Sequence, residues 1–384
     1  MTAHVHIAIC GAGPVGQALA LMLHQQGIPA HDIVLLDAKT SAQACHDARS
    51  IALSYGSKQI LDALHVWPVK ATAIRQIHVS RRGHFGRSLI SASDYQLPAL
   101  GYVARYGDII APLEARLQEC GITVQRPVLV NAVDEQTDRV TVTLSELGNL
   151  GTSNTLSADL VIQAEGGTFS DQDQRTQHHD YQQTAVIAHI TTSAPVAQRA
   201  FERFTAEGPL ALLPQDDGYA LVWCARPDHA ASLLTLNDAN FKQALQQAFG
   251  NRLGTILTAS ARHAYPLGLN AQTYATARTV RIGNAAQTLH PVAGQGLNLG
   301  LRDARVLAGC LGTCPPDSAL ASFIKKRQID RQMTIRLTDG MARIFAGTPD
   351  GTLTQAVLGL GLGVVDMLAP AKKMLAQQMM FGWR

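Results

Sequence analysis

A glycine-rich turn near the N-terminus constrains the fold more than any other feature of the sequence. Residues 5–10 form an almost continuous apolar run, which is typical of a strand buried on both faces of a parallel sheet. Residues 17–26 have the apolar composition of a packed helix. Between them lies the sequence Gly11, Ala12, Gly13, Pro14, Val15 and Gly16. Strand, tight turn and helix in this order predict a site where backbone amides and a helix N-terminus bind a pyrophosphate.

An acidic residue follows the next predicted strand at the spacing of a dinucleotide site. Strand residues 33–36 end at Asp37, which lies 21 positions after Gly16. A carboxylate at this place accepts hydrogen bonds from ribose hydroxyls and repels a 2′-phosphate. We therefore expect the first site to bind the adenosine half of a dinucleotide and to disfavour NADP. The alternative is a helix-opening turn without a ligand.

Two further glycine motifs follow predicted strands later in the chain. Residues 160–162 lead to Glu165–Gly166, and residues 279–282 lead to Gly283–Asn284. A helix then begins near residues 294–301, where glycines leave backbone amides free at its start. One such turn is weak support for a ligand site. Three in this order predict one extended cofactor bound along its whole length, and FAD fits that description.

The three motifs together resemble those of the group A flavoprotein aromatic hydroxylases, the para-hydroxybenzoate hydroxylase type. That family combines an N-terminal Gly-x-Gly-x-x-Gly, a central Asp-Gly, and a C-terminal Gly-Asp followed by a Pro and a Gly-rich helix start. More narrowly, the chain is similar to the ubiquinone-biosynthesis branch, the 2-octaprenyl-6-methoxyphenol hydroxylase family. The stretches behind this similarity are residues 200–204, 208–214, 221–224 and 283–303, with Arg327, Asp330 and Arg331.

The resemblance implies which residues bind FAD. Those matched to the dinucleotide and ribityl parts are Gly11, Gly13, Pro14, Val15, Gly16, Asp37, Arg49, Glu165, Gly166, Gly283 and Asn284. Those matched to the lining of the isoalloxazine ring are Pro291, Gly294, Gly296, Leu297 and Asn298. By this match the first turn holds the pyrophosphate, Asp37 the adenosine ribose and Asn284 the ribityl chain, while Arg49 lies along the cofactor.

The resemblance also implies a reaction. NADPH or NADH reduces FAD, O2 adds at the flavin C4a, and the resulting hydroperoxide hydroxylates a phenol. A phenolate attacks the distal oxygen more readily than a phenol, so a group that assists deprotonation is needed. His290, directly before Pro291, is the candidate general base, and we predict both as catalytic residues. The alternative is that His290 only caps or fills the turn.

Two positions depart from the family pattern. Glu165 replaces the central Asp, and its extra methylene moves the carboxylate by about one C–C bond, roughly 1.5 Å. Asn284 replaces the Asp of the third motif, so its amide oxygen accepts a ribityl hydrogen bond without charge assistance. Asn is familiar at this place in the ubiquinone branch. Glu165 is the departure that bears on how the nicotinamide is handled.

The order of elements predicts an α/β fold with interleaved domains. A Rossmann-like FAD-binding domain is expected from residues 1–74, 103–180 and 266–330. A substrate domain on an antiparallel sheet is expected from residues 75–102 and 181–265. One helix, residues 238–249, should pack on that sheet with Asn237 as its N-cap. Residues 331–384 are expected to be C-terminal helices.

Composition excludes several classes of protein. The net charge of +3 and the lack of a basic run argue against nucleic-acid binding. The six scattered cysteines form no CxxC pair, so we expect reduced thiols, a cytoplasmic location and no metal site. His178–His179 near two aspartates is interpreted as a solvated loop, because ligand spacing does not recur. No signal peptide is recognisable at the N-terminus.

The predicted function is hydroxylation of the aromatic ring of a polyprenylated phenol in ubiquinone biosynthesis. Residues 356–368 are apolar and Gly-rich; they favour a helix packed on the body or, alternatively, a surface that docks on the inner membrane or on partner enzymes. Two other functions stay open. One is a flavin-dependent oxidoreductase acting on another lipid or aromatic. The other, suggested by Glu165, is a non-catalytic subunit of a ubiquinone-synthesis complex.

Overall fold

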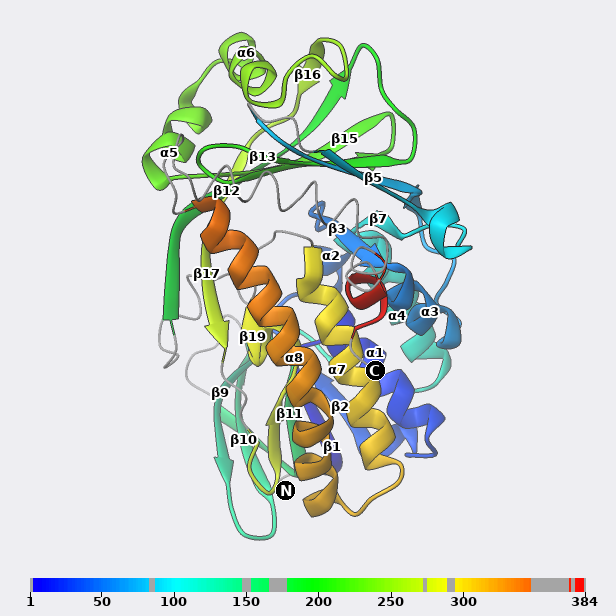
Figure 1. The fold of residues 1–384 in the computed structure, drawn as a ribbon. Coiled ribbons are helices and arrows are strands. Elements are labelled where there is room, and N and C mark those ends of the chain that lie inside the picture. The colour runs from blue at the N-terminus through cyan, green and yellow to red at the C-terminus, as the bar shows by residue number, and fades with distance from the viewer. Residues whose placement is uncertain are drawn as a thin grey trace.

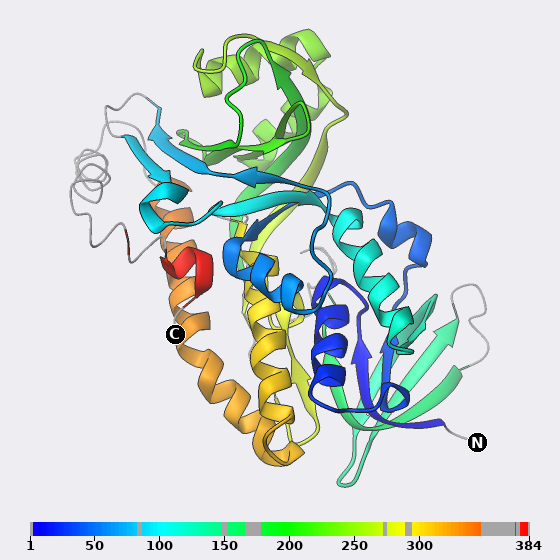
Figure 2. The same ribbon diagram turned by 90° about the vertical axis from the view of Figure 1, so that its right-hand side faces the viewer.

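A computed structural model describes residues 3–82, 87–146, 153–165, 178–271, 275–288, 294–346, 373 and 377–382. Its strands form a parallel sheet, a large sheet and a small sheet (Figures 1 and 2). The parallel sheet and its helices occupy the lower part of Figure 1, and the large sheet lies above them. The predicted α/β architecture is therefore present.

The parallel sheet holds the strand of the first glycine motif. In spatial order its strands are β8 (Thr123–Gln125), β2 (Ile33–Leu36), β1 (Ala3–Cys10), β11 (Ser153–Gln163), β10 (Val140–Glu146) and β9 (Val128–Glu135), with β18 (Thr279–Arg281) also on β11. Strands β8, β2, β1, β11 and β18 run parallel, while β10 runs antiparallel to both of its neighbours, β11 and β9. The residues of β1 from Ile7 to Cys10 are almost completely buried, as the apolar run predicted.

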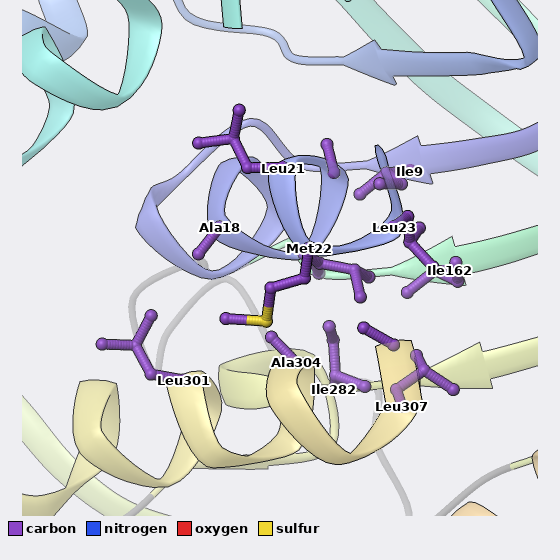
Figure 3. Close-up of a cluster of buried hydrophobic side chains, with 14 of the residues drawn as sticks. Ile9, Ala18, Leu21, Met22, Leu23, Ile162, Ile282, Leu301, Ala304 and Leu307 are labelled. Atoms are coloured by element: carbon purple, nitrogen blue, oxygen red, sulfur yellow. The ribbon is translucent and has the colours of Figure 1, made fainter. Parts of the chain in front are cut away.

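Helices cover one face of the parallel sheet. They are α1 (Pro14–Gln25), α4 (Tyr106–Glu119) and α7 (Gln295–Leu311). The main apolar core lies between these helices and the sheet, and it includes Ile9, Ile162 and Ile282 from three strands. Figure 3 shows Met22 of α1 pointing toward Ala304 of α7 in this core. On the opposite face, Ala8 of β1 and Val34 of β2 lie in a smaller apolar cluster with residues of β9, β10 and β11.

The large sheet corresponds to the strand-rich region of the sequence. Its strands in spatial order are β19 (Gln287–Thr288), β17 (His263–Ala271), β12 (His178–Thr192), β15 (Gly218–Ala225), β14 (Pro209–Gln215), β13 (Arg199–Phe204), β5 (Gln76–Arg81) and β6 (Arg87–Ser91), with β16 (Ile256–Ala259) on β12. Neighbours pair antiparallel except β13 and β5, which are parallel. Strands β16 and β17 are separated by residues 260–262.

Two helices pack on the outer face of the large sheet. Helix α6 (Asp238–Phe249) is the predicted one, and its N-cap Asn237 accepts a hydrogen bond from the Asn240 N–H at 2.9 Å, as expected. Helix α5 (Pro227–Thr235) was not predicted. Their apolar side chains form a second core with the residues of β12, β13, β14 and β15 that face these helices.

The small sheet joins the two larger ones. Its strands are β3 (Ser50–Ser54), β7 (Gly101–Arg105) and β4 (Ala71–Ile74). The short helices are η1 (Ala30–Asp32), α2 (Ser41–Cys45), α3 (Tyr55–Ala63), η2 (Ala92–Tyr95) and η4 (Gly283–Ala285). Ile74 and Val103 of the small sheet pack against Ala200 of β13. The Ser50 hydroxyl also donates to the Gln215 side chain at 2.8 Å, so the sheets are tied by both apolar and polar contacts.

The C-terminal region is helical where the structure describes it. Helix α8 (Pro316–Ala346) packs along α7 (Figure 1). Residues 377–382 return to the body, where Met380 is buried beside Ala92 and Leu100. Among the described residues, no helix is long and apolar enough to cross a membrane. The apolar residues 356–368 lie outside the described residues.

Candidate cofactor and active site

The predicted glycine motifs meet at one edge of the parallel sheet. Strands β2, β1, β11 and β18 run parallel, so the loops after them leave from the same edge. The Gly11 N–H donates to the Leu36 carbonyl at 2.7 Å, which joins the first turn to β2. The Ala164 N–H donates to the Cys10 carbonyl at 2.7 Å, which joins the end of β11 to β1. Three segments far apart in sequence therefore lie side by side.

Close backbone contacts require glycine in the first turn. Gly11 has φ of 105°, and a Cβ there would lie 2.7 Å from the Ala164 carbonyl carbon. A Cβ on Gly16 would lie only 2.0 Å from the Gly11 carbonyl oxygen. Since real Cβ atoms do not approach this closely, the turn and α1 can keep these positions only without side chains. This is the cradle that a pyrophosphate needs at a helix N-terminus.

The start of helix α1 is packed against a half-buried tyrosine. Gly13 is the N-cap and Pro14 the first residue of the helix. A Cβ on Gly13 would lie 2.9 Å from the Tyr106 hydroxyl oxygen. The Arg49 guanidinium lies over the Tyr106 ring, 4.9 Å from its centroid, and is paired with Asp47 at 2.7 Å. The structure therefore brings the predicted Arg49 to the first turn.

Asp37 is held beside the same turn. Its carboxylate accepts hydrogen bonds from the Ala12 N–H (2.7 Å) and the Lys39 N–H (2.8 Å). Arg126, nearly buried, donates to the Ala12 carbonyl at 2.5 Å and pairs with Glu114, and its guanidinium lies 3.9 Å from Asp37. Sequence analysis missed Arg126 and Glu114, because an isolated charged residue in a helix or loop forms no motif. Together these groups fix the turn and place a carboxylate next to it.

The third motif contacts the first directly. Gly283 has φ of 58°, and a Cβ there would lie 3.4 Å from Val15 of helix α1. A Cβ on Gly300 would lie 2.6 Å from Val15, so helices α1 and α7 cross closely at this point. The Asn284 side chain points toward the start of α7, with its Oδ1 3.7 Å from the position of a Cβ on Gly296. The two predicted motifs thus form one surface.

Asn298 locks the start of helix α7 onto the small sheet. Its Oδ1 accepts hydrogen bonds from the Ser54 N–H (2.8 Å) and the Ser57 hydroxyl (2.7 Å). Its Nδ2 donates to the carbonyls of Ala52 (3.1 Å) and Gly294 (2.7 Å). Gly294, the N-cap, has φ of 58°. Because both ends of the Asn298 amide are used inside the protein, its role here is to position the helix start.

The structure describes some of the remaining predicted site residues. Glu165 lies two residues after the end of β11, and burial together with the charge of Glu165 raises the pKa of the Cys10 thiol. Leu297 is partly buried and packs against the main core. Gly166, His290 and Pro291 lie outside the described residues.

Behind the third motif lies a buried cluster of charged residues. The Asp303 carboxylate accepts hydrogen bonds from Arg327 (2.8 Å), Arg331 (2.9 Å), the Gln287 amide (3.0 Å) and the Gly283 N–H (3.1 Å). Asp330 pairs with Arg327 and with Arg302. Burial would raise the pKa of Asp303, but the adjacent arginines lower it to about 2. Asp303 therefore stays ionised and connects α7, α8 and the Gly283 turn.

A second buried carboxyl lies on the face of the large sheet turned toward the small sheet. Glu202 of β13 shares this face with Ala200, which packs against Ile74 and Val103. Its Oε1 is buried without a hydrogen-bond partner among the described residues. Burial raises the pKa of Glu202 to about 7. The stretch containing Glu202 was selected by sequence resemblance, but no pattern in it indicated a buried acid.

Replacing Glu202 by glutamine should make stability less dependent on pH. The folded-state pKa of about 7 lies above the ordinary 4.5, so the carboxylate disfavours folding increasingly between these values and fully above them. The variant should gain up to about 3 kcal/mol over the wild type above pH 7 and nothing below pH 4.5. Urea unfolding across this range measures the difference, with Glu119→Gln as the exposed control. A difference in unfolding free energy that does not change with pH would contradict the raised pKa of Glu202.

The fold and the site define a flavoprotein of the dinucleotide-binding type. Residues 4–334 match the family described as FAD binding domain. The chain therefore belongs to this family.

Three relatives that match most of the chain show the range of names found, and two of them are named as hydroxylases. An uncharacterized protein, slr1300, of Synechocystis is 32% identical over 98% of this chain and 92% of its own. Ubiquinone hydroxylase UbiL of Rhodospirillum rubrum is 29% identical over 97% and 89%. The 3-demethoxyubiquinol 3-hydroxylase of Escherichia coli is 30% identical over 89% of each chain.

Among solved structures, p-nitrophenol 4-monooxygenase PnpA from Pseudomonas putida DLL-E4 has the same fold. Its TM-score is 0.77 at 16% identity, and each chain is covered completely. These findings confirm the predicted fold class, FAD as the cofactor and the enzyme class, an FAD-dependent monooxygenase. They also confirm the resemblance to the ubiquinone-biosynthesis branch.

Proposed function

We propose that the protein hydroxylates the aromatic ring of a polyprenylated phenol in ubiquinone biosynthesis, using NADPH or NADH and O2. The observation that supports this most strongly is the near full-length similarity to ubiquinone hydroxylases, which extends across both the FAD-binding motifs and the large sheet. Bound FAD supplies the chemistry that reduces and activates O2. The protein supplies binding, orientation and control of protons.

The residues present fit FAD. The crowded Gly11–Gly16 turn and the N-terminus of α1 suit the pyrophosphate, and Asp37 suits a ribose. Asn284, which points toward the start of α7, suits the ribityl chain. The N-terminus of α7, fixed by Asn298, would present free backbone amides to the electron-rich edge of the ring.

Further assignments are proposals drawn from the sequence. His290 is proposed to accept the phenol proton and Pro291 to line the reacting ring. The FAD-binding domain is proposed to comprise residues 1–74, 103–180 and 266–330, with the substrate domain inserted between these segments. A polyprenyl chain partitions into a bilayer, so we propose a cytoplasmic enzyme that docks on the inner membrane surface beside other ubiquinone-synthesis enzymes.

The test begins with the absorption spectrum of purified protein titrated with FAD, followed by NADH and NADPH without oxygen. A bound flavin that bleaches, and then hydroxylates a polyprenyl phenol when oxygen is admitted, is the expected result. Bleaching with hydroxylation of a different aromatic or lipid would favour the alternative oxidoreductase. Bound flavin without any product, for each phenol offered, would contradict the proposed reaction. A chain that binds no flavin would instead be the assembly subunit suggested by Glu165.

A further inference from the structure

One face of the large sheet gathers arginines that have no acidic partner among the residues that the structure describes. Strands β13, β5 and β6 lie at one end of the sheet, and β5 and β6 are the blue-to-cyan strands on the left of Figure 2. Strand register places Arg203 opposite Ser80 and Ser80 opposite Arg87, so both arginines lie on one face. Arg199, two positions from Phe201 and four from Arg203, shares it.

Two further arginines extend this arginine face. Arg82 follows β5, and its N–H donates to the Phe204 carbonyl at 3.0 Å. Arg252 lies after helix α6 and approaches the His78 ring at 3.1 Å. None of the arginines on this face forms an ion pair among the described residues. The five are Arg82, Arg87, Arg199, Arg203 and Arg252.

The charges on the arginine face repel one another. Burial and the charges of Arg252, Arg199 and Arg87 lower the pKa of His78 to about 4, so His78 stays neutral at physiological pH. Burial together with neighbouring arginines also lowers the pKa values of Arg203 and Arg252. Polar contacts hold two of them in place, since Arg199 donates to Gln76 at 2.6 Å and Arg203 to the Ala248 carbonyl at 3.2 Å. A cluster held together against its own repulsion is suited to an external anion.

We propose that the arginine face docks on a membrane surface through anionic lipid headgroups. Guanidinium groups bind phosphate oxygens through paired hydrogen bonds. Leu89, between Arg87 and the end of edge strand β6, is 39% exposed and adds an apolar side chain among the basic ones, a combination typical of interfacial binding. The proposal rests on the proposed function, because a polyprenyl substrate would be taken from the bilayer.

Vesicle flotation of the full-length protein tests this proposal. Wild type should float with phosphatidylglycerol-containing vesicles and not with phosphatidylcholine alone, and added salt should weaken binding. The triple variant R82Q/R87Q/R252Q should bind about a hundredfold more weakly, since each surface arginine contributes about fivefold. The matched control K70Q/R116Q/R139Q removes the same charge from surface positions elsewhere and should bind like the wild type. R82K/R87K/R252K should also retain binding.

Several outcomes would overturn the proposal. Equal binding of the R82Q/R87Q/R252Q variant and the wild type would do so, as would equal flotation with neutral vesicles or no flotation at all. Flavin content and thermal midpoint verify folding of each variant. Hydroxylation of a water-soluble short-chain phenol should be unchanged in the triple glutamine variant. If the wild type does not hydroxylate the short-chain phenol, that result counts against the proposed function. Vesicle binding would then be judged by itself.

Discussion

Replacing Asp303 by asparagine is expected to lower the free energy of unfolding by about 3–5 kcal/mol. The side chain is completely buried and pairs with Arg327 and Arg331. Asparagine fills nearly the same volume but removes the charge. The cluster holds three arginines and two carboxylates, so removing the Asp303 charge leaves only Asp330, which pairs with Arg302 and Arg327. Arg331, whose ion pair is with Asp303, would then stay buried without compensation. Removing one partner of a buried pair costs far more than losing an exposed one.

The pH dependence of this difference gives a second readout. The pKa of Asp303 is lowered from 3.8 to about 2 by the adjacent arginines despite burial. Its stabilising effect is therefore complete above pH 3.8 and is lost as the pH falls through about 2. The gap in stability between wild type and Asp303→Asn should be constant near neutral pH and shrink in acid.

Urea unfolding of the two proteins measures the effect. Asp138→Asn is the matched control, because Asp138 carries the same chemical change in an exposed pair with Arg139 and should unfold at the wild-type midpoint. Flavin affinity should also fall in Asp303→Asn, since Asp303 accepts the Gly283 N–H that shapes the third motif. Similar midpoints for Asp303→Asn and Asp138→Asn would show that the buried cluster adds nothing to stability.

The elements that could be predicted were those fixed by local sequence. Residues 33–36 form the predicted strand β2 with all four side chains buried, because a strand covered on both faces has to be continuously apolar. Asn237 caps α6 as predicted, since a cap depends only on the adjoining turn. The need for glycine at position 16 was predictable for a related reason, because its close contact with the Gly11 carbonyl lies within one strand–turn–helix unit.

Features that depend on contacts between distant segments could not be predicted from the sequence. Arg126 reaches the first turn only because β8 and β2 pair, and the loop after β8 then lies beside Asp37. The arginine face arises from the register of β13 with β5, strands more than a hundred positions apart. Helix α5 was missed because it has only nine residues and follows strand β15 almost directly. The burial of Glu202 could not be predicted, because it depends on how the large sheet and the small sheet pack together.

Replacing Gly16 by alanine is expected to abolish most FAD binding. A Cβ there would lie 2.0 Å from the Gly11 carbonyl oxygen, and contacts under 3.0 Å essentially never occur, so the backbone must move by about 1 Å. The moving parts are the turn and the N-terminus of α1, whose amides the pyrophosphate needs. Displacements of this size cost on the order of a hundredfold in precisely positioned sites. We expect FAD affinity to fall about a hundredfold and stability by about 1–3 kcal/mol.

Flavin fluorescence titration and urea unfolding separate the two effects. Gly309→Ala is the control, because Gly309 lies in helix α7 with nothing within 4 Å of its added Cβ. That variant should keep wild-type FAD affinity and be slightly more stable, since alanine suits a helix interior better than glycine. Unchanged FAD affinity in Gly16→Ala would mean that the first turn does not bind the pyrophosphate.

Gly13 tests whether the turn needs glycine for packing or for the ligand. A Cβ on Gly13 would meet the Tyr106 hydroxyl oxygen at 2.9 Å, and Tyr106→Phe removes that oxygen while keeping the ring. If glycine served only the packing, the double variant Gly13→Ala/Tyr106→Phe would recover both stability and FAD affinity. Because backbone has to approach the pyrophosphate closely, we expect stability to recover and FAD affinity to stay low. Recovery of both would limit Gly13 to a structural role and leave Gly11 and Gly16 as the glycines that form the cradle.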